Sequence, residues 1–291
     1  MKPILEIKNL TKYYGNTLAV KDLSLFLNEG EIFGFIGKNG AGKSTTIRCI
    51  MNLLNKTEGQ ILINGKEFDK DDIKTKKLIG YLPSEINLYD DYTVKEILDY
   101  HESFYNKKIN KRRKELVELF QLDETKRIED LSLGNQKKLG IILSLMHEPK
   151  ILILDEPTSG LDPVMQNIFY ELLLKEKKKG TTCFYSTHVL SEISKICDRV
   201  GIIKEGSLLK VETIKELNER NLNIVTVELL EDKEKLIEEL NTKVTKKDKN
   251  TIKFKNNLEI NELIKILSNY KIKKLLIEEA TLEDIFIDYY K

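Results

Sequence analysis

The amino-acid sequence predicts an α/β protein with two units: residues 1–215, built on a mostly parallel sheet, and a small α+β unit over residues 222–291. Short apolar segments of strand length alternate with amphipathic helical segments in the first unit. A glycine-rich loop joins one such strand to a helix, and a later apolar strand ends in two carboxylates. Both of these features are absent from the second unit.

The composition limits the possible partners and compartments. The 291 residues include 48 basic and 47 acidic side chains, so no strong field indicates nucleic acid as a partner. Three isolated cysteines without metal-ligand spacing indicate a reducing compartment. The amino terminus lacks a signal-peptide pattern, and no apolar segment reaches the roughly 18 residues of a membrane span. We therefore expect a cytoplasmic chain that reaches a membrane only through a partner.

The first part of the chain predicts a small antiparallel sheet followed by a strand, a loop and a helix. Ile4–Ile7 and Lys21–Leu27 alternate apolar and polar side chains. Glu31–Ile36 is a short apolar strand that leads directly into the glycine loop, and a helix with one apolar face begins near Lys43. Gln60–Ile63, followed by an Asn-Gly turn, indicates a further strand.

The middle of the chain predicts helices around two buried strands. Val94–Leu122 has a helical spacing of apolar residues, and Leu139–Met146 indicates a buried helix that ends before a proline. Lys150–Leu154 and Thr181–Ser186 are apolar strands, separated by the helical segment Phe169–Lys179. This alternation is typical of a parallel sheet covered on both faces.

The second unit predicts a different, smaller fold. Its expected elements are Ile224–Leu229 (strand), Lys233–Leu240 (helix), Lys243–Lys246 (strand), Thr251–Lys255 (strand), Ile260–Leu267 (helix) and Ile272–Glu278 (strand). This order, βαββαβ, matches a ferredoxin-like fold. A last amphipathic helix would place Leu282, Ile285 and Phe286 on one side.

Residues 37–44, Gly-Lys-Asn-Gly-Ala-Gly-Lys-Ser, match the phosphate-loop pattern in its required place between a strand and a helix. Backbone N–H groups and the helix N-terminus would bind the phosphates of ATP. Lys43 would reach the β- and γ-phosphates, and Ser44 would ligate Mg²⁺. A chance glycine-rich turn is the less favoured alternative. The residues expected to bind nucleotide here are Gly37, Lys38, Asn39, Gly40, Ala41, Gly42, Lys43, Ser44 and Thr45.

The apolar strand at residues 151–154 ends in Asp155 and Glu156. The carboxyl ends of strands are where α/β sheets bind ligands. Asp155 would hold Mg²⁺, directly or through water, and Glu156 is the candidate general base for the attacking water. Alone, such a strand end would more often be a surface loop, but beside the phosphate loop it predicts a functional site for nucleotide hydrolysis.

A third motif, Leu131-Ser-Leu-Gly-Asn-Gln136, lies between the other two and resembles the LSGGQ signature of ABC-transporter ATP-binding subunits. The resemblance covers roughly Ile4–Lys210. It implies a P-loop NTPase core of the ABC type, with an antiparallel subdomain and a helical subdomain at about residues 87–148. It also implies that part of the signature acts in trans on ATP held by a second copy, through Ser132, Gly134, Asn135 and Gln136.

The resemblance implies roles for three further residues. Tyr14 matches the aromatic that stacks on adenine, and Asp162 ends the loop that touches the opposite subunit. His188 follows an apolar strand and matches the histidine that contacts the γ-phosphate. By contrast, His101 and His147 match no family position, and we expect them to be structural or solvated.

The sequence departs from the family pattern in two places. Ser84 stands where the family usually has glutamine, in a loop that links the ATP core to the helical part. Glu85 is a candidate substitute, but a carboxylate near Mg²⁺ and ATP would interact with both differently. In the signature, Leu133 replaces glycine and Asn135 replaces glutamine, while the serine and second glycine are retained. We expect activity to be retained.

The function implied by the resemblance is an ATPase subunit that drives a separate transmembrane permease, with the helical segment against the permease and the chain peripheral on the inner face of the membrane. The small second unit ending in Leu282–Phe286 resembles exporters of the bacitracin-resistance type, which carry drugs, peptides or antibiotics. Two alternatives remain open: a soluble ABC protein that acts on ribosomes or DNA, and a regulatory ATPase of weak turnover. The cargo does not follow from this chain.

Overall fold

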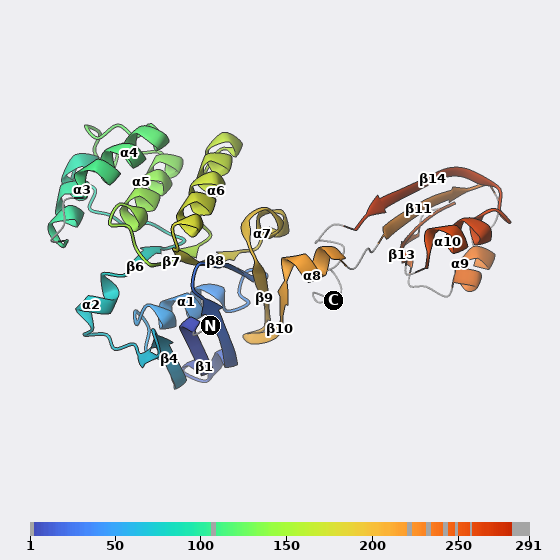
Figure 1. Cartoon of the computed structure of the whole chain (residues 1–291), viewed down its shortest axis with the longest axis horizontal. Helices are drawn as coiled ribbons and strands as arrows, with labels where there is room; N and C mark the ends of the chain where they lie inside the picture. Colours follow the sequence, from blue (N-terminus) through green and yellow to red (C-terminus); the bar gives the residue numbers. More distant parts are fainter. Residues whose placement is uncertain are drawn as a thin grey trace. The chain divides into compact units, whose positions relative to one another are not determined.

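The computed structural model describes residues 3–105, 109–219, 223–230, 234–240, 244–247, 250–256 and 258–280. The chain forms two compact units, Met1–Ile214 and Lys215–Lys291 (Figure 1). The predicted final helix with Leu282, Ile285 and Phe286 lies outside the described residues.

A six-stranded sheet forms the centre of the first unit. Its strands in spatial order are β10 (Ser207–Thr213), β9 (Arg199–Lys204), β3 (Ile32–Ile36), β8 (Thr182–Thr187), β7 (Ile151–Asp155) and β6 (Ile79–Leu82). All neighbours are parallel except β10, an antiparallel edge strand. Every residue of β3, β7 and β8 is buried, because layers cover both faces. Ile36 pairs with Thr187, and Asp155 pairs with Ser186, so the three strands end at one edge.

An antiparallel sheet covers the phosphate-loop side of the unit. Its strands in spatial order are β2 (Thr17–Asn28), β1 (Pro3–Tyr14), β4 (Glu58–Ile63) and β5 (Lys66–Glu67). The alternation seen in the sequence turns side chains such as Leu5 and Leu27 into the core. They pack there with Ile47 and Ile50 of the helix α1 (Lys43–Ile50), which follows the phosphate loop.

The remaining helices of the first unit are α2 (Ile73–Lys76), α3 (Val94–Ser103), α4 (Asn110–Phe120), α5 (Leu133–Leu145), α6 (Pro163–Lys178) and α7 (Leu190–Ile196), and α8 (Ile214–Glu219) begins at the last residue of this unit. Polar side chains cap the starts of α2, α3, α5 and α6. The predicted helical stretch Val94–Leu122 contains two helices, α3 and α4. The helix predicted from Leu139 begins at Leu133, because Ser132 caps it. The helix predicted from Phe169 begins at Pro163, because Asp162 caps it and proline suits the first helical position.

The second unit has the predicted ferredoxin-like order. Its elements are β11 (Asn223–Leu229), α9 (Glu234–Leu240), β12 (Val244–Lys247), β13 (Thr251–Asn256), α10 (Ile260–Leu267) and β14 (Ile272–Glu279). The strands form one antiparallel sheet in the order β12-β13-β11-β14. Val227 and Phe254 from the sheet pack with Leu236 of α9 and Leu263 of α10, so the two helices cover one face (Figure 1).

Gly80 of β6 provides a test of how closely α5 packs on the central sheet. A Cβ at this position would lie 2.0 Å from the carbonyl oxygen of Ser144 in α5 and 2.8 Å from Leu152 Cδ2. We expect Gly80→Ala to lower the free energy of unfolding by about 3 kcal/mol, because backbone must move to relieve the overlap. Denaturant titration of the full chain measures this loss.

Gly65→Ala is the matched control. Gly65 has open space around its Cα and a φ of +75°, so the substitution meets no atom and should cost about 1 kcal/mol from backbone strain alone. Equal denaturation midpoints for the two variants would show that α5 and β6 are not in close contact at Gly80.

Candidate active site

A cleft of about 700 Å³ lies at the sheet edge where β3 and β7 end. Most of its lining comes from residues that the sequence analysis singled out. The predicted residues that line it are Asn39, Gly40, Gly42, Lys43, Ser44, Thr45, Ser84, Glu85 and Glu156. Four residues that were not predicted complete the lining, because they belong to no motif: Leu18 and Ala19 of β2, and Glu205 and Gly206 of the turn between β9 and β10.

The phosphate loop leaves the backbone N–H groups of α1 available to a ligand. Gly40 and Gly42 have φ values of +79° and +106°, which suit glycine, and Gly42 caps α1 without a side-chain hydrogen bond. A Cβ on Gly42 would lie 2.8 Å from the carbonyl oxygen of Ala19. This open helix N-terminus favours an anion such as phosphate.

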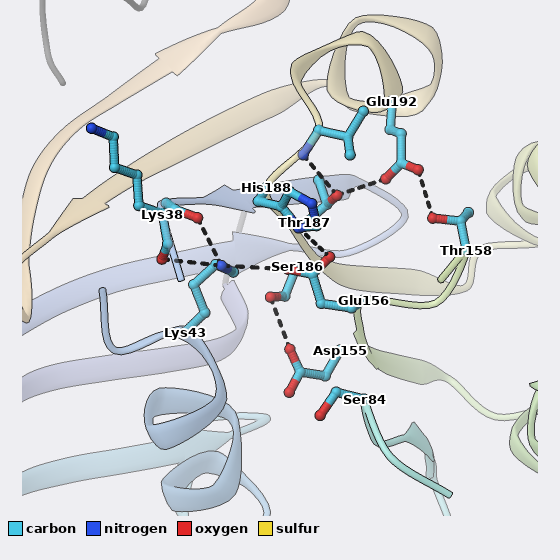
Figure 2. Close-up of polar contacts among 12 residues, drawn as sticks. Lys38, Lys43, Ser84, Asp155, Glu156, Thr158, Ser186, Thr187, His188 and Glu192 are labelled. Carbon is cyan, nitrogen blue, oxygen red and sulfur yellow. Dashed lines mark hydrogen bonds and ion pairs between the residues drawn. The ribbon is translucent and has the colours of Figure 1, made fainter. Parts of the chain in front are cut away.

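Lys43 is buried between the loop and the end of β7. Its Nζ donates hydrogen bonds to the carbonyl oxygens of Gly37 at 2.7 Å and Lys38 at 3.4 Å (Figure 2). It also lies 3.4 Å from Glu156 Oε1. The ammonium group is therefore held at the bottom of the loop, within reach of both a phosphate and the carboxylate.

Asp155 and Glu156 take different positions at the end of β7. The Asp155 side chain is buried, and its Oδ1 accepts a hydrogen bond of 3.0 Å from Ser186 Oγ. Glu156 has a left-handed φ of +48°, and its N–H donates to the Ser186 carbonyl at 3.0 Å. Non-glycine residues adopt this conformation uncommonly, and here it turns the chain sharply at the end of the strand. The turn places the Glu156 carboxylate in the cleft.

His188 completes the group around Glu156. It follows β8, and its Nδ1 lies 2.9 Å from Glu156 Oε2 (Figure 2). One carboxylate oxygen thus faces Lys43 and the other faces His188. The structure therefore brings together Lys43, Glu156 and His188 from three separate strand ends.

Lys137 is a site residue that the sequence analysis missed. It lies on α5 directly after the signature, is buried, and donates to the carbonyl oxygen of Ser84 at 2.8 Å and of Glu156 at 3.4 Å. Burial lowers the pKa of Lys137, and the nearby Asp155 and Glu156 carboxylates oppose that shift. The Ser84 loop is thus held beside the cleft through its backbone, whatever its side chain. The sequence did carry a signal for this role, namely a lysine on the apolar face of this helix.

The donor set at the cleft fits Mg²⁺. Within the described residues, no group of three or more His, Cys, Asp or Glu could hold a metal ion alone. Mg²⁺ needs no such group, since it binds one or two protein oxygens and completes its shell with water and phosphates. Ser44 and the buried Asp155 carboxylate offer such oxygens. The ion would neutralise charge on the phosphates.

The signature residues do not line this cleft. Ser132, at the start of α5, accepts a hydrogen bond of 3.3 Å from the Asn135 N–H. Gly134 lies against the loop before α6, because a Cβ there would be 2.9 Å from the Gly160 carbonyl oxygen. Leu133 is 67% exposed. The cleft of this chain is therefore not lined by the chain's own signature residues.

Three other predicted residues lie at the margins of the site or away from it. Tyr14, at the end of β1, is 46% exposed, with Lys12 Nζ 5.4 Å from its ring centre. Asp162 Oδ1 accepts the N–H groups of Val164 and Met165, each at 3.0 Å, as the cap of α6. Their roles toward adenine and the opposite subunit stay predictions. His147 is buried, with its ring 4.6 Å from that of Tyr105, which favours the structural alternative.

Comparison with known proteins places this arrangement among ABC transporter subunits. Residues 20–159 match the family described as ABC transporter. The chain is 36% identical over 226 residues to an uncharacterized ABC transporter ATP-binding protein, MJ1023, of Methanocaldococcus jannaschii, covering 75% of this chain and 80% of the relative. It is 37% identical over 235 residues to the bacitracin transport ATP-binding protein BcrA of Bacillus licheniformis, covering 79% and 76%. For the linearmycin resistance ATP-binding protein LnrL of Bacillus subtilis, the identity is 37% over 222 residues, covering 75% and 71%.

Solved structures agree on the fold. An ATP-binding subunit of an ABC transporter superposes with a TM-score of 0.70 at 29% identity, covering 75% of this chain and 92% of that chain. A dimeric structure of MJ0796, a bacterial ABC transporter cassette, gives 0.67 at 27% identity, covering 72% and 98%. The same cassette has been solved as a dimer with ADP and Pi after hydrolysis, with a TM-score of 0.66 at 26% identity, covering 72% of this chain and 98% of that chain.

The position of Lys43 predicts its contribution to nucleotide affinity. Lys43→Met keeps the aliphatic stem and removes the ammonium group. Hydrogen bonds to charged groups contribute about 1.5–3 kcal/mol, so we expect ATP to bind about 10- to 100-fold more weakly. Calorimetric titration with a non-hydrolysable ATP analogue measures the change.

Lys56→Met is the charge-matched control, since Lys56 lies outside the cleft lining and pairs with Glu67 at 3.5 Å. It should bind the analogue like the unchanged chain. Equal dissociation constants for the Lys43 and Lys56 variants would rule out a phosphate contact by Lys43.

Proposed function

Since the chain belongs to the family of ABC transporter ATP-binding subunits, whose members are ATPases, we propose that two copies close over ATP and drive a separate transmembrane permease. The main support for this proposal is that the residues expected to act on one ATP molecule are divided between two places on the chain. The cleft contains Lys43 and Glu156, whereas Ser132 and Gly134 lie outside it. A second copy, or a homologous subunit, would supply the missing signature to each bound ATP.

The geometry supports a direct hydrolytic mechanism. Lys43 would stabilise the negative charge on the β- and γ-phosphates, together with Mg²⁺ held by Ser44 and Asp155. Glu156 would take a proton from the attacking water. His188, 2.9 Å from the other oxygen of that carboxylate, would keep Glu156 oriented and face the γ-phosphate.

The helical part of the first unit offers a surface for the permease. Tyr89, Tyr92, Tyr100 and Phe104 are 70%, 49%, 60% and 50% exposed. Their rings lie in two pairs, with centres 5.8 Å apart for Tyr89 and Tyr92 and 4.9 Å for Tyr100 and Phe104. Exposed apolar groups of this kind mark protein contacts. We infer that cytoplasmic loops of the permease bind here.

Attachment to a membrane would depend on that contact. In the described ranges, no helix combines the length and the apolar character of a membrane span. The chain would therefore sit peripherally on the inner face of the membrane, through the permease. BcrA and LnrL are named for bacitracin transport and linearmycin resistance. By analogy we propose export of a drug, peptide or antibiotic.

Co-purification separates this proposal from a role on ribosomes or DNA. The tagged chain should be recovered from membranes with a multi-span subunit, and adding that subunit in detergent should raise its ATP hydrolysis. Recovery with ribosomes or nucleic acid, and no membrane subunit that changes turnover, would overturn the transport function.

The role of Glu156 predicts a separation of binding from turnover. Glu156→Gln removes the base but keeps the shape of the side chain. Loss of a general base typically costs about 10²- to 10⁴-fold in rate, and we expect that loss in phosphate release while ATP still binds. The rate of phosphate release and the dissociation constant for ATP are measured on the same preparation of the variant.

Glu205→Gln is the matched control. Glu205 also lines the cleft, from the turn between β9 and β10, but it has no place in the proposed mechanism. It should hydrolyse ATP at a rate within about twofold of the unchanged chain. Turnover like the unchanged chain in Glu156→Gln would remove Glu156 from the role of general base.

A further inference from the structure

Glu192 of α7 is a buried carboxylate four residues after His188, and it is 5% exposed. Four hydroxyl groups donate hydrogen bonds to it. Thr158 Oγ1 at 2.6 Å and Tyr170 OH at 3.1 Å bind its Oε1. Thr187 Oγ1 at 2.7 Å and Tyr185 OH at 3.0 Å bind its Oε2. Figure 2 shows Thr158 and Thr187 approaching the two oxygens from different segments.

The four donors divide into two kinds. Tyr170 lies within α6 and Tyr185 within β8, so the tyrosines attach the carboxylate to regular elements. Thr187 is the last residue of β8, directly before the loop that carries His188, and Thr158 lies in the loop that follows β7. Each oxygen of Glu192 therefore holds one tyrosine and one threonine.

The two threonines lead to opposite sides of the proposed site. Thr187 precedes His188, and its Oγ1 also accepts the Val189 N–H at 3.0 Å. Thr158 lies in the loop that begins at Glu156 and continues to Gly160, where the chain touches Gly134 of the signature. The first loop thus carries His188, which contacts Glu156, and the second runs from Glu156 itself to the segment expected to serve the second copy.

The energetics favour joint movement of the two loops. A buried carboxylate is costly unless its acceptor positions are filled, and hydrogen bonds to charged groups are stronger than neutral ones. Burial, and next the Glu192 charge, raise the pKa of Tyr170 and of Tyr185, so both hydroxyls stay protonated donors at neutral pH. If either threonine moved alone, one oxygen of the buried Glu192 carboxylate would keep only its tyrosine donor, which would cost free energy.

We propose that Glu192 is a positioning residue that couples the His188 loop to the loop at residues 158–162, and so links the two ATP sites of a pair. The inference rests on the proposed shared site. A change at the γ-phosphate that shifts His188 would pass through Thr187 and Glu192 to Thr158. From there it would reach the signature segment that faces the other ATP.

The matched pairs of donors give the test. Thr158→Val and Tyr170→Phe each remove one hydroxyl from Glu192 Oε1, and Thr187→Val and Tyr185→Phe each remove one from Oε2. We expect each threonine variant to lower kcat for ATP about tenfold with KM unchanged, and the double threonine variant to lose about the same tenfold, not a hundredfold. The tyrosine variants should unfold more easily but keep kcat within about twofold.

A structural readout tests the coupling without hydrolysis. The chain has three histidines, so the His188 imidazole can be followed by NMR in the full chain. Thr158→Val should shift the His188 resonance although Thr158 makes no direct hydrogen bond to it. Tyr170→Phe, which affects the same oxygen, should not. Thr158→Ser restores the hydroxyl and should restore both the resonance and kcat.

Additive losses in the double threonine variant would overturn the proposal. So would tyrosine variants that lose as much kcat as the threonine variants, or a His188 resonance that ignores Thr158→Val. If Thr187→Val does not fold, the set of Thr158→Val, Thr158→Ser and Tyr170→Phe decides by itself. Absence of hydrolysis in the unchanged chain would instead count against the proposed function.

Discussion

The contact on which the site depends is the Glu156 carboxylate, held between Lys43 Nζ at 3.4 Å and His188 Nδ1 at 2.9 Å. It exists because β3, β7 and β8 are parallel neighbours whose carboxyl ends coincide. Three segments far apart in the sequence therefore emerge at one edge. A shift in strand register would separate the phosphate loop from both Glu156 and His188.

Two buried charges hold the loops around that contact. Lys137 on α5 donates to carbonyl oxygens of Ser84 and Glu156, and Glu192 on α7 accepts four hydroxyl groups. Both are placed by helices that pack on the central sheet, so the loops take their positions from the core. The Ser84 loop keeps its place at the cleft independently of its side chain, since the backbone is what Lys137 binds.

Sequence reasoning succeeded where the signal is local. Glycines at residues 37–42 and four apolar residues before Asp155 and Glu156 define a loop and a strand without knowledge of the rest of the fold. It placed the starts of α5 and α6 too late, because Ser132 and Asp162 act as caps outside the apolar pattern. Lys137 and Glu192 were missed as site residues, because their partners come from elements distant in the sequence.

The central claim is that each ATP site is shared between two copies, and mixing two inactive variants tests it. Ser132→Asp keeps a capping group on α5 but places a carboxylate where a γ-phosphate is expected. Mixed with Glu156→Gln chains, it should form pairs with one intact site, and random pairing should restore about a quarter of the hydrolysis rate of the unchanged chain. A rate no greater than the sum of the two variants measured separately would contradict the shared site.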